Sequence, residues 1–252
     1  MGFPTVVAIC GKGGVGKTVF GGAVLRVFWQ RCLRILAVDA DPAMGLRYLL
    51  GLKDDIKTLG DLREDLIRRA KTDRDPEQIA GAMDYLLLEA LTETDKFSFL
   101  AMGRSRSRGC FCPVNSLLKE SARKLAQNYD VVLVDAEAGV EQINREVMSS
   151  VDSIVVLMDN SQRSRHSVEL IKQMAVDLNM RARMGVVLNR AKDLGETVHA
   201  AVSALEVPVW GTIPEDEELL RNDALGRSVF DLPANSPVLE SAERIVDFLV
   251  EA

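Results

Sequence analysis

The sequence from Gly11 to Thr18, GKGGVGKT, is the feature that most constrains the fold of this chain. It fits the pattern G-x-x-x-x-G-K-[ST], in which glycines let consecutive backbone N–H groups turn toward a phosphate. The apolar, β-branched run at residues 4–10 predicts a buried parallel strand, and the apolar stretch at residues 19–31 predicts a helix. A helix that begins at such a loop points its positive end at a bound anion. The order strand, glycine loop, helix therefore predicts a phosphate-binding loop.

Residues within this loop are expected to hold different parts of a nucleotide. Lys17 can reach the β- and γ-phosphate oxygens, and the hydroxyl group of Thr18 can ligate Mg²⁺. The positions expected to contact the nucleotide here are Gly11, Gly13, Gly14, Val15, Gly16, Lys17, Thr18 and Val19. Lys12 is not needed to hold a phosphate within one subunit, so the bland interpretation of this residue is a solvated surface charge.

Strand-like apolar runs alternate with helical segments along the chain, which is typical of repeated βα units around a mostly parallel sheet. The expected strands lie near residues 4–10, 34–39, 97–102, 130–135, 153–158, 183–189 and 207–213. The segment 56–92 predicts two helices interrupted at Asp75-Pro76. With 252 residues, of which 47% are hydrophobic, we expect a single α/β P-loop domain over residues 1–252. Its mostly parallel sheet should have about seven or eight strands, with helices on both faces.

Acidic residues follow two of these strands, at the sheet edge where ligands bind in such folds. Asp39 and Asp41 end one strand, and Asp135 ends another. Carboxylates there can hold Mg²⁺ directly or through water, and they can orient an attacking water. The alternatives are a turn that begins at Asp41 and a plain strand end at Asp135. Gly139 could offer its N–H to a γ-phosphate.

Polar residues also follow the last two predicted strands. Asn189 and Arg190 end one, and Pro214, Glu215 and Asp216 follow the other. An amide both donates and accepts hydrogen bonds, which suits the Watson–Crick edge of adenine. The alternative for each is an ordinary turn residue.

Cys110 and Cys112 form a C-x-C pair that could share one soft cation, but two ligands are too few for a closed tetrahedral site. A two-fold dimer would supply the other two thiols. The alternatives are two ordinary loop cysteines or a redox pair. Cys10 and Cys32 are expected to be small buried residues.

Together the loop, the D-x-D-P segment at residues 39–42 and the D-x-E-A-G segment at residues 135–139 resemble the MinD/ParA/nitrogenase-iron-protein class of ATPases, whose loop is a deviant Walker A motif. In that class a lysine at the place of Lys12 crosses a dimer interface to the nucleotide of the partner. The resemblance implies that Asp41 positions the hydrolytic water, and that Asn189 reads the base with the backbone around residues 214–216 beside it. It also implies that Asp39 supports the Mg²⁺ site of Thr18 and Asp135. Lys12, Lys17 and Asp41 are then the residues that carry catalysis.

The C-x-C pair and residues 159–164 narrow the resemblance to the CooC family, ATPases that mature nickel enzymes, chiefly carbon monoxide dehydrogenase. A sister branch serves acetyl-CoA synthase. The resemblance implies a homodimer that binds ATP or ADP with Mg²⁺, holds Ni²⁺ or Zn²⁺ at the dimer interface through Cys110 and Cys112, and serves a client nickel enzyme. Val19 departs from the class, in which a threonine often follows the loop and offers a hydroxyl group near the α-phosphate. Residues 104–108 are unusually basic beside a cation site.

Charge and hydropathy exclude several partners. A formal net charge of −6 argues against a protein whose whole surface binds nucleic acid. The N-terminus has no export signal, and no apolar stretch approaches the roughly 20 residues that span a bilayer. The helix expected at residues 241–250 is too acidic to anchor an anionic membrane. We therefore expect a cytoplasmic protein that binds neither nucleic acid nor membrane.

The sequence is also compatible with two other functions. The first is a ParA- or MinD-type partitioning or positioning ATPase, which would use the same loop to bind DNA or membrane. The second is an iron–sulfur reductase or scaffold similar to the nitrogenase iron protein, in which the cluster ligands are usually spread over two segments. One C-x-C pair argues against the second.

Overall fold

A single mixed sheet organises the part of the chain that the structure, a computed structural model, describes: residues 4–52, 55–62, 64–65, 85–103, 120–136, 151–190 and 202–250. Its strand order is β3-β4-β2-β5-β1-β6-β7-β8, and all neighbours are parallel except β3 and β4. The strands are β1 (Thr5–Gly11), β2 (Ile35–Asp39), β3 (Thr92–Glu93), β4 (Ser98–Ala101), β5 (Val131–Asp135), β6 (Ser153–Met158), β7 (Arg183–Asn189) and β8 (Val209–Ile213). The predicted fold class and all seven predicted strands are confirmed, and β3 is an additional edge strand.

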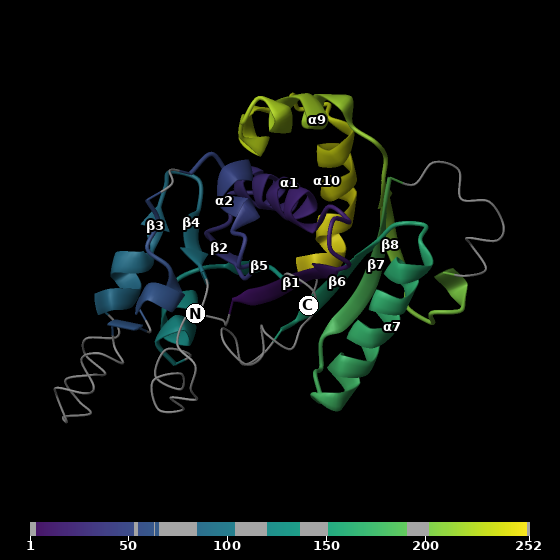
Figure 1. The fold of residues 1–252 in the computed structure, drawn as a ribbon, viewed down its shortest axis with the longest axis horizontal. Coiled ribbons are helices and arrows are strands. Elements are labelled where there is room, and N and C mark those ends of the chain that lie inside the picture. The colour runs from purple at the N-terminus through teal and green to yellow at the C-terminus, as the bar shows by residue number, and fades with distance from the viewer. Residues whose placement is uncertain are drawn as a thin grey trace.

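Helices cover both faces of this sheet (Figure 1). One face carries α1 (Lys17–Gln30), α2 (Gly45–Leu49), α9 (Glu217–Ala224), the 3₁₀ turn η1 (Val229–Asp231) and α10 (Pro237–Val250), and the other carries α7 (Gln162–Asp177). Further helical residues lie at 59–62, 85–90 and 120–126. The expected helix interruption at residues 75–76 lies outside the described residues.

Two apolar layers, one on each face, hold the helices to the sheet. Alternate residues of a strand point to opposite faces, so Val6 and Ala8 join the layer under α7, while Val7 and Ile9 join the layer under α1 and α10. The central strands are therefore buried on both sides, which explains why they read as continuous apolar runs. This packing fixes the carboxyl ends of the strands, where the polar residues of the site lie.

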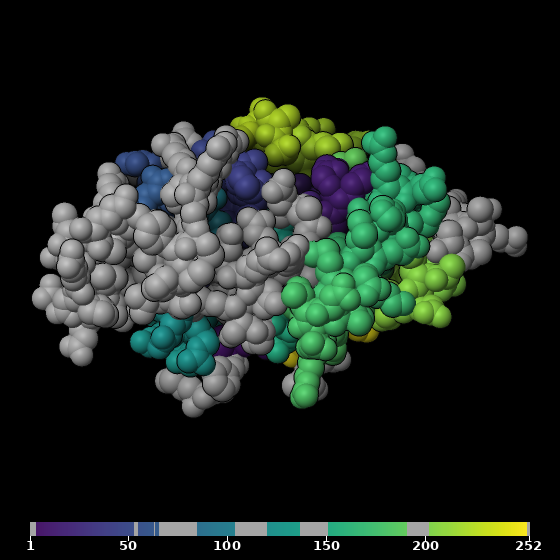
Figure 2. All heavy atoms as spheres, turned by 60° about the horizontal axis from the view of Figure 1, so that its bottom comes forward, coloured from purple at the N-terminus to yellow at the C-terminus, as the bar shows by residue number. Residues whose placement is uncertain are grey.

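The helix α10 contributes its whole apolar face to the core. The buried members of this face are Val238, Leu239, Ala242, Ile245, Val246 and Leu249. The helix packs against α1 and β8, and it begins earlier than the sequence predicted. Helix α7, by contrast, forms part of the molecular surface (Figure 2). No helix among the described residues is long and apolar enough to cross a membrane.

Candidate nucleotide-binding site

The loop between β1 and α1 is shaped by three glycines in the left-handed region. Gly11, Gly14 and Gly16 have φ values of 139°, 75° and 98°. A Cβ atom at Gly11 would collide with the carbonyl oxygen of Leu157, and one at Gly16 would collide with the side-chain amide of Asn189. Glycine is therefore required at both places by conformation and by space. The loop leads directly into the N-terminus of α1, whose free N–H groups are suited to binding an anion.

The two lysines of the loop have different partners. Lys17 is buried, and its ammonium group donates to the backbone carbonyl of Lys12 at 3.3 Å. Lys12 donates to the carboxylate of Asp159 at 2.7 Å and to the hydroxyl oxygen of Ser161 at 3.2 Å. These partners lie between β6 and α7, so Lys12 is not a solvated surface charge in this structure.

Asp159 is strongly stabilised as an anion by this arrangement. Its partial burial acts to raise the pKa, but hydrogen bonds from Lys12, Ser161 and Ser164 outweigh it and hold the pKa of Asp159 well below its usual range. The same Ser161 is the N-cap of α7 and accepts from the Ser164 N–H at 3.2 Å. The loop lysine is thus tied to the start of a long helix.

Asp39 and Asp135 lie side by side at the ends of neighbouring strands, because β2 and β5 pair in register at these residues. Asp39 accepts hydrogen bonds from the backbone N–H groups of Asp41 at 3.1 Å and Leu46 at 3.0 Å. Burial, with repulsion from Asp135, nevertheless raises the pKa of Asp39 to about 7. Asp39 therefore organises the chain that follows β2 and presents a carboxyl group of unusually high proton affinity.

The carboxylate of Asp135 is suited to a cation. Both of its oxygen atoms are buried and make no hydrogen bond to the residues that the structure describes. Burial raises the pKa of Asp135 to about 6, and the positive charge of Lys17 limits the rise. A buried carboxylate without donors is costly unless a cation compensates it.

These oxygen atoms fit Mg²⁺, which is usually bound by one or two carboxylates together with substrate phosphates and waters. Asp135, Asp39 and Thr18 would hold the ion, and Mg²⁺ supplies neutralisation of the charge on the β- and γ-phosphate oxygens. No cluster of three or more histidine, cysteine, aspartate or glutamate residues suited to a metal occurs within the described ranges.

Asp41 begins the turn that the sequence suggested as the alternative to a ligand role. Its carboxylate accepts from the Ala43 N–H at 2.8 Å, and its carbonyl accepts from the Met44 N–H at 2.9 Å. The turn keeps Asp41 at the same sheet edge as Asp39, so the geometry of a turn and a role in positioning water are compatible. Gly139, Cys110, Cys112 and the basic residues 104–108 lie outside the described residues.

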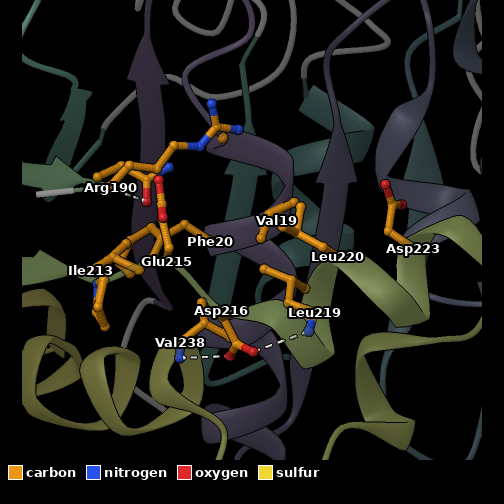
Figure 3. A pocket seen from close by; sticks show the side chains of 13 residues that line it. Val19, Phe20, Arg190, Ile213, Glu215, Asp216, Leu219, Leu220, Asp223 and Val238 are labelled. Atoms are coloured by element: carbon orange, nitrogen blue, oxygen red, sulfur yellow. Dashed lines mark hydrogen bonds between the residues drawn. The ribbon is translucent and has the colours of Figure 1, made fainter. Parts of the chain in front are cut away.

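A pocket of about 140 Å³ lies beside the glycine loop (Figure 3). It is lined by Gly16, Val19, Phe20, Asn189, Arg190, Ile213, Pro214, Glu215, Asp216, Leu219, Leu220, Asp223 and Val238. The structure thus brings together the loop and every residue that the sequence suggested for the base. The contribution of α9 to the pocket, through Leu219, Leu220 and Asp223, was not predicted, because these residues belong to no recognised motif.

Two of these residues already make structural hydrogen bonds. The Asn189 amide donates to the Val15 carbonyl at 2.7 Å and accepts from the Arg190 N–H at 3.0 Å, so it fastens β7 to the glycine loop. Asp216 accepts from the N–H groups of Leu219 at 3.1 Å and Val238 at 3.2 Å (Figure 3), and also from the Ser236 hydroxyl group. Its carboxylate therefore caps α9 and joins it to the start of α10.

Comparison with known proteins agrees with this geometry. The family model described as the CobQ/CobB/MinD/ParA nucleotide binding domain matches residues 6–229. An uncharacterized ATP-binding protein of Methanocaldococcus jannaschii is 33% identical, over 97% of this chain and 98% of the relative. The carbon monoxide dehydrogenase accessory protein CooC of Rhodospirillum rubrum is 26% identical, over 90% of this chain and 89% of the relative.

A solved structure shares the fold. The septum site-determining protein MinD of Pyrococcus horikoshii, complexed with Mg-ADP, superposes with a TM-score of 0.72 and 19% identity, over 98% of this chain and 96% of that chain. Since the family model covers most of the chain and a relative of matching length exceeds 30% identity, the chain belongs to the CobQ/CobB/MinD/ParA family of nucleotide-binding domains.

Proposed function

We propose that this ATPase is a homodimeric metallochaperone that delivers nickel to a client metalloenzyme such as carbon monoxide dehydrogenase or acetyl-CoA synthase. The observation that carries the proposal is the pair Cys110 and Cys112, in the segment that follows β4 along the chain. The similarity to CooC over 90% of the chain supports it.

The nucleotide site has the groups that phosphoryl transfer to water requires. The β- and γ-phosphates would lie at the glycine loop against the Lys17 ammonium group and the start of α1. Asp41 would orient the attacking water, and Asn189 with the backbone of residues 214–216 would hold the adenine. Lys12 would leave Asp159 to reach the nucleotide of the partner subunit, so dimer formation would replace one anionic partner of Lys12 by another.

A backbone hydrogen bond joins the nucleotide site to Met102, shortly before the segment that contains the cysteines. The Met102 N–H donates to the carbonyl of Asp39 at 2.8 Å, and the Met102 carbonyl accepts from the Gly60 N–H at 2.9 Å. Met102 and Gly103 lead directly into residues 104–119. A change at Asp39 on nucleotide binding or hydrolysis would therefore act on Met102, which directly precedes the cysteine segment in the sequence.

The metal is cargo in this proposal, and the dimer completes its site. Two thiolates from each subunit at a two-fold axis give the four sulfur ligands of a closed tetrahedral site. Zn²⁺ binds such thiolates well, so zinc in the purified protein is compatible with a role in nickel delivery.

A second function fits the same family: a partitioning or positioning ATPase of the ParA or MinD type. The family model and the fold shared with MinD favour it. The apolar face of α10 is buried in the core rather than available to a membrane, and the net charge of −6 does not favour DNA. DNA binding that requires ATP and falls steeply with salt would support this second function.

The proposal is tested by anaerobic titration of Ni²⁺ and Zn²⁺ into the wild type and a Cys110→Ser/Cys112→Ser double variant, with the oligomer mass measured with and without ATP. We expect one metal ion per dimer and its loss in the double variant. Cys32→Ser is the matched control, because Cys32, which was wrongly expected to be buried, is an exposed free thiol outside the C-x-C pair. Metal binding that survives the double substitution would contradict the metallochaperone proposal.

A further inference from the structure

We propose that Asp223 accepts a hydrogen bond from the nucleoside part of the bound nucleotide and thereby contributes to nucleotide selectivity. The inference concerns the nucleotide pocket alone and does not depend on the metal role of the cysteines. The donor is a hydroxyl group of the ribose or the exocyclic amine of the base, and the experiment below distinguishes them.

Helix α9 turns one face toward the pocket. Leu219, Leu220 and Asp223 line it, and their spacing of three and four residues places them on one side of the helix. Leu220 is 61% exposed although it lines the pocket, so a ligand in the pocket would cover apolar surface that the protein itself leaves uncovered. Figure 3 shows Asp223 beyond Leu220 on this helix.

No contact within the described part of the fold explains why a negatively charged side chain stands at position 223. Its carboxylate is exposed and forms neither a hydrogen bond nor an ion pair within the described part of the chain. The residue also lies in the last turn of α9, where the partial negative charge of the helix end disfavours an acid. An aspartate here costs stability and returns no contact within the described residues.

The other acceptors of the pocket wall already have partners. The Asn189 side-chain oxygen accepts from the Arg190 N–H, and the Asp216 carboxylate holds the starts of α9 and α10. Glu215 also has an interaction of its own. Among the described acidic side chains that line this pocket, Asp223 is the one whose carboxylate has no partner within the described residues, so all of its acceptor sites are available to a ligand.

The chemistry of the ligand restricts what a carboxylate can do here. The phosphates of a nucleotide are anionic and repel Asp223, so a favourable contact requires a hydrogen-bond donor. ATP offers such donors only as the 2′- and 3′-hydroxyl groups of the ribose and the N6 amine of adenine. A site that pairs a substrate O–H or N–H rejects the analogue that lacks it, because the acceptor is then left unpaired.

The test is calorimetric titration of the full-length protein with the Mg²⁺ complexes of ATP, 2′-deoxy-ATP, 3′-deoxy-ATP and purine riboside triphosphate, which lacks the N6 amine. We expect one of the three analogues to bind wild type about fivefold more weakly than ATP. Asp223→Ala should weaken ATP by a similar factor and bring that analogue level with ATP. Glu217→Gln is the control, because Glu217 lies on α9, carries the same charge and does not line the pocket.

Each outcome bears on the proposal. Loss of discrimination in Asp223→Ala but not in Glu217→Gln supports it, and the analogue affected identifies the donor. Equal weakening of ATP and all analogues by Asp223→Ala, or equal effects of the two substitutions, overturns it. A wild type that binds ATP and every analogue alike overturns the role of Asp223 while leaving the nucleotide site intact, whereas a wild type that binds none of them contradicts the site itself.

Discussion

Single carboxylates at the sheet edge show how a binding function and stability oppose each other. Asp135 is 1% exposed, and its oxygen atoms lack donors within the described residues. Because burial raises its pKa from 3.8 to about 6, the metal-free folded state retains a proton over a pH range where the unfolded chain has lost it. The contribution of this residue to stability is therefore greatest below about pH 4, falls as the pH rises from about 4 to about 6, and is constant above that.

Asp135→Asn removes the buried charge. In the absence of nucleotide and Mg²⁺ we expect this variant to be more stable than wild type at pH 8, by about 3 kcal/mol, with the difference vanishing below about pH 4. Urea unfolding at several pH values measures this, and ATP hydrolysis by the same variant should be abolished. If the difference in stability between wild type and Asp135→Asn is the same at pH 4 and at pH 8, Asp135 does not titrate in this way.

The ion pair between Lys12 and Asp159 makes a second prediction at this scale. Both side chains are partly exposed, so Asp159→Asn should lower the free energy of unfolding at pH 7 by about 1 kcal/mol or less. Because the pKa of Asp159 is lowered in the fold, this contribution is present above the unfolded value near 4 and is lost as the pH falls below it.

If Lys12 reaches a partner subunit, freeing it should also favour the dimer. We expect Asp159→Asn to dimerise at a lower ATP concentration than wild type, as measured by light scattering, and Lys12→Ala to remain monomeric. Unchanged ATP dependence in Asp159→Asn would show that the ion pair does not compete with dimerisation.

The shape of the glycine loop between β1 and α1 depends on a backbone conformation that only glycine adopts easily. Gly16 has a φ of 98° and no room for a Cβ atom, whereas a Cβ atom at Gly13 would meet nothing within 4 Å. Gly16→Ala should therefore destabilise the protein by about 1–3 kcal/mol and weaken ATP binding, and Gly13→Ala should leave the stability close to that of wild type. Thermal unfolding with and without ATP measures both effects, and equal midpoints for the two variants would contradict the argument.

The elements that the sequence predicted are those with long apolar runs. Six of the seven predicted strands are mostly buried in the sheet, and β8 at its edge is largely uncovered, yet hydrophobic runs bounded by glycine, proline or acidic residues were sufficient to find all seven. Strand β3 has only two residues and pairs antiparallel with β4 across a tight turn, which leaves no periodic signal. The start of α10 at Pro237 was also missed, although proline is well tolerated in the first turn of a helix.

Site residues within one motif were predictable, but contacts between distant segments were not. The pairing of Asp39 with Asp135 follows from the strand ends alone. Lys12 and Asp159 are 147 residues apart, and the wall that α9 adds to the pocket depends on how the helix packs. These contacts arise from tertiary packing, which no local spacing encodes.

At the scale of the whole molecule, the C-terminal helix is part of the core rather than an appendage. Leu249 is fully buried near the end of α10. We expect Leu249→Ala to lower the free energy of unfolding by about 2–5 kcal/mol, and Glu240→Ala on the exposed side of the same helix to change it by about 0.5 kcal/mol or less. Urea unfolding of both variants measures this. A small effect of Leu249→Ala would contradict the conclusion that the end of α10 is part of the core.

The strand order separates the two ends of a bound nucleotide. Strand β1, which carries the phosphate loop, is three strands from β4 and two from β7. At about 4.8 Å per strand, the base pocket and the strand that leads into residues 104–119 lie about 24 Å apart, on opposite sides of the loop. The base pocket is thus remote from the end of β4, and the phosphate loop lies between them. A substitution in the base pocket can therefore change nucleotide recognition without any direct contact with the end of β4, on the far side of the phosphate loop.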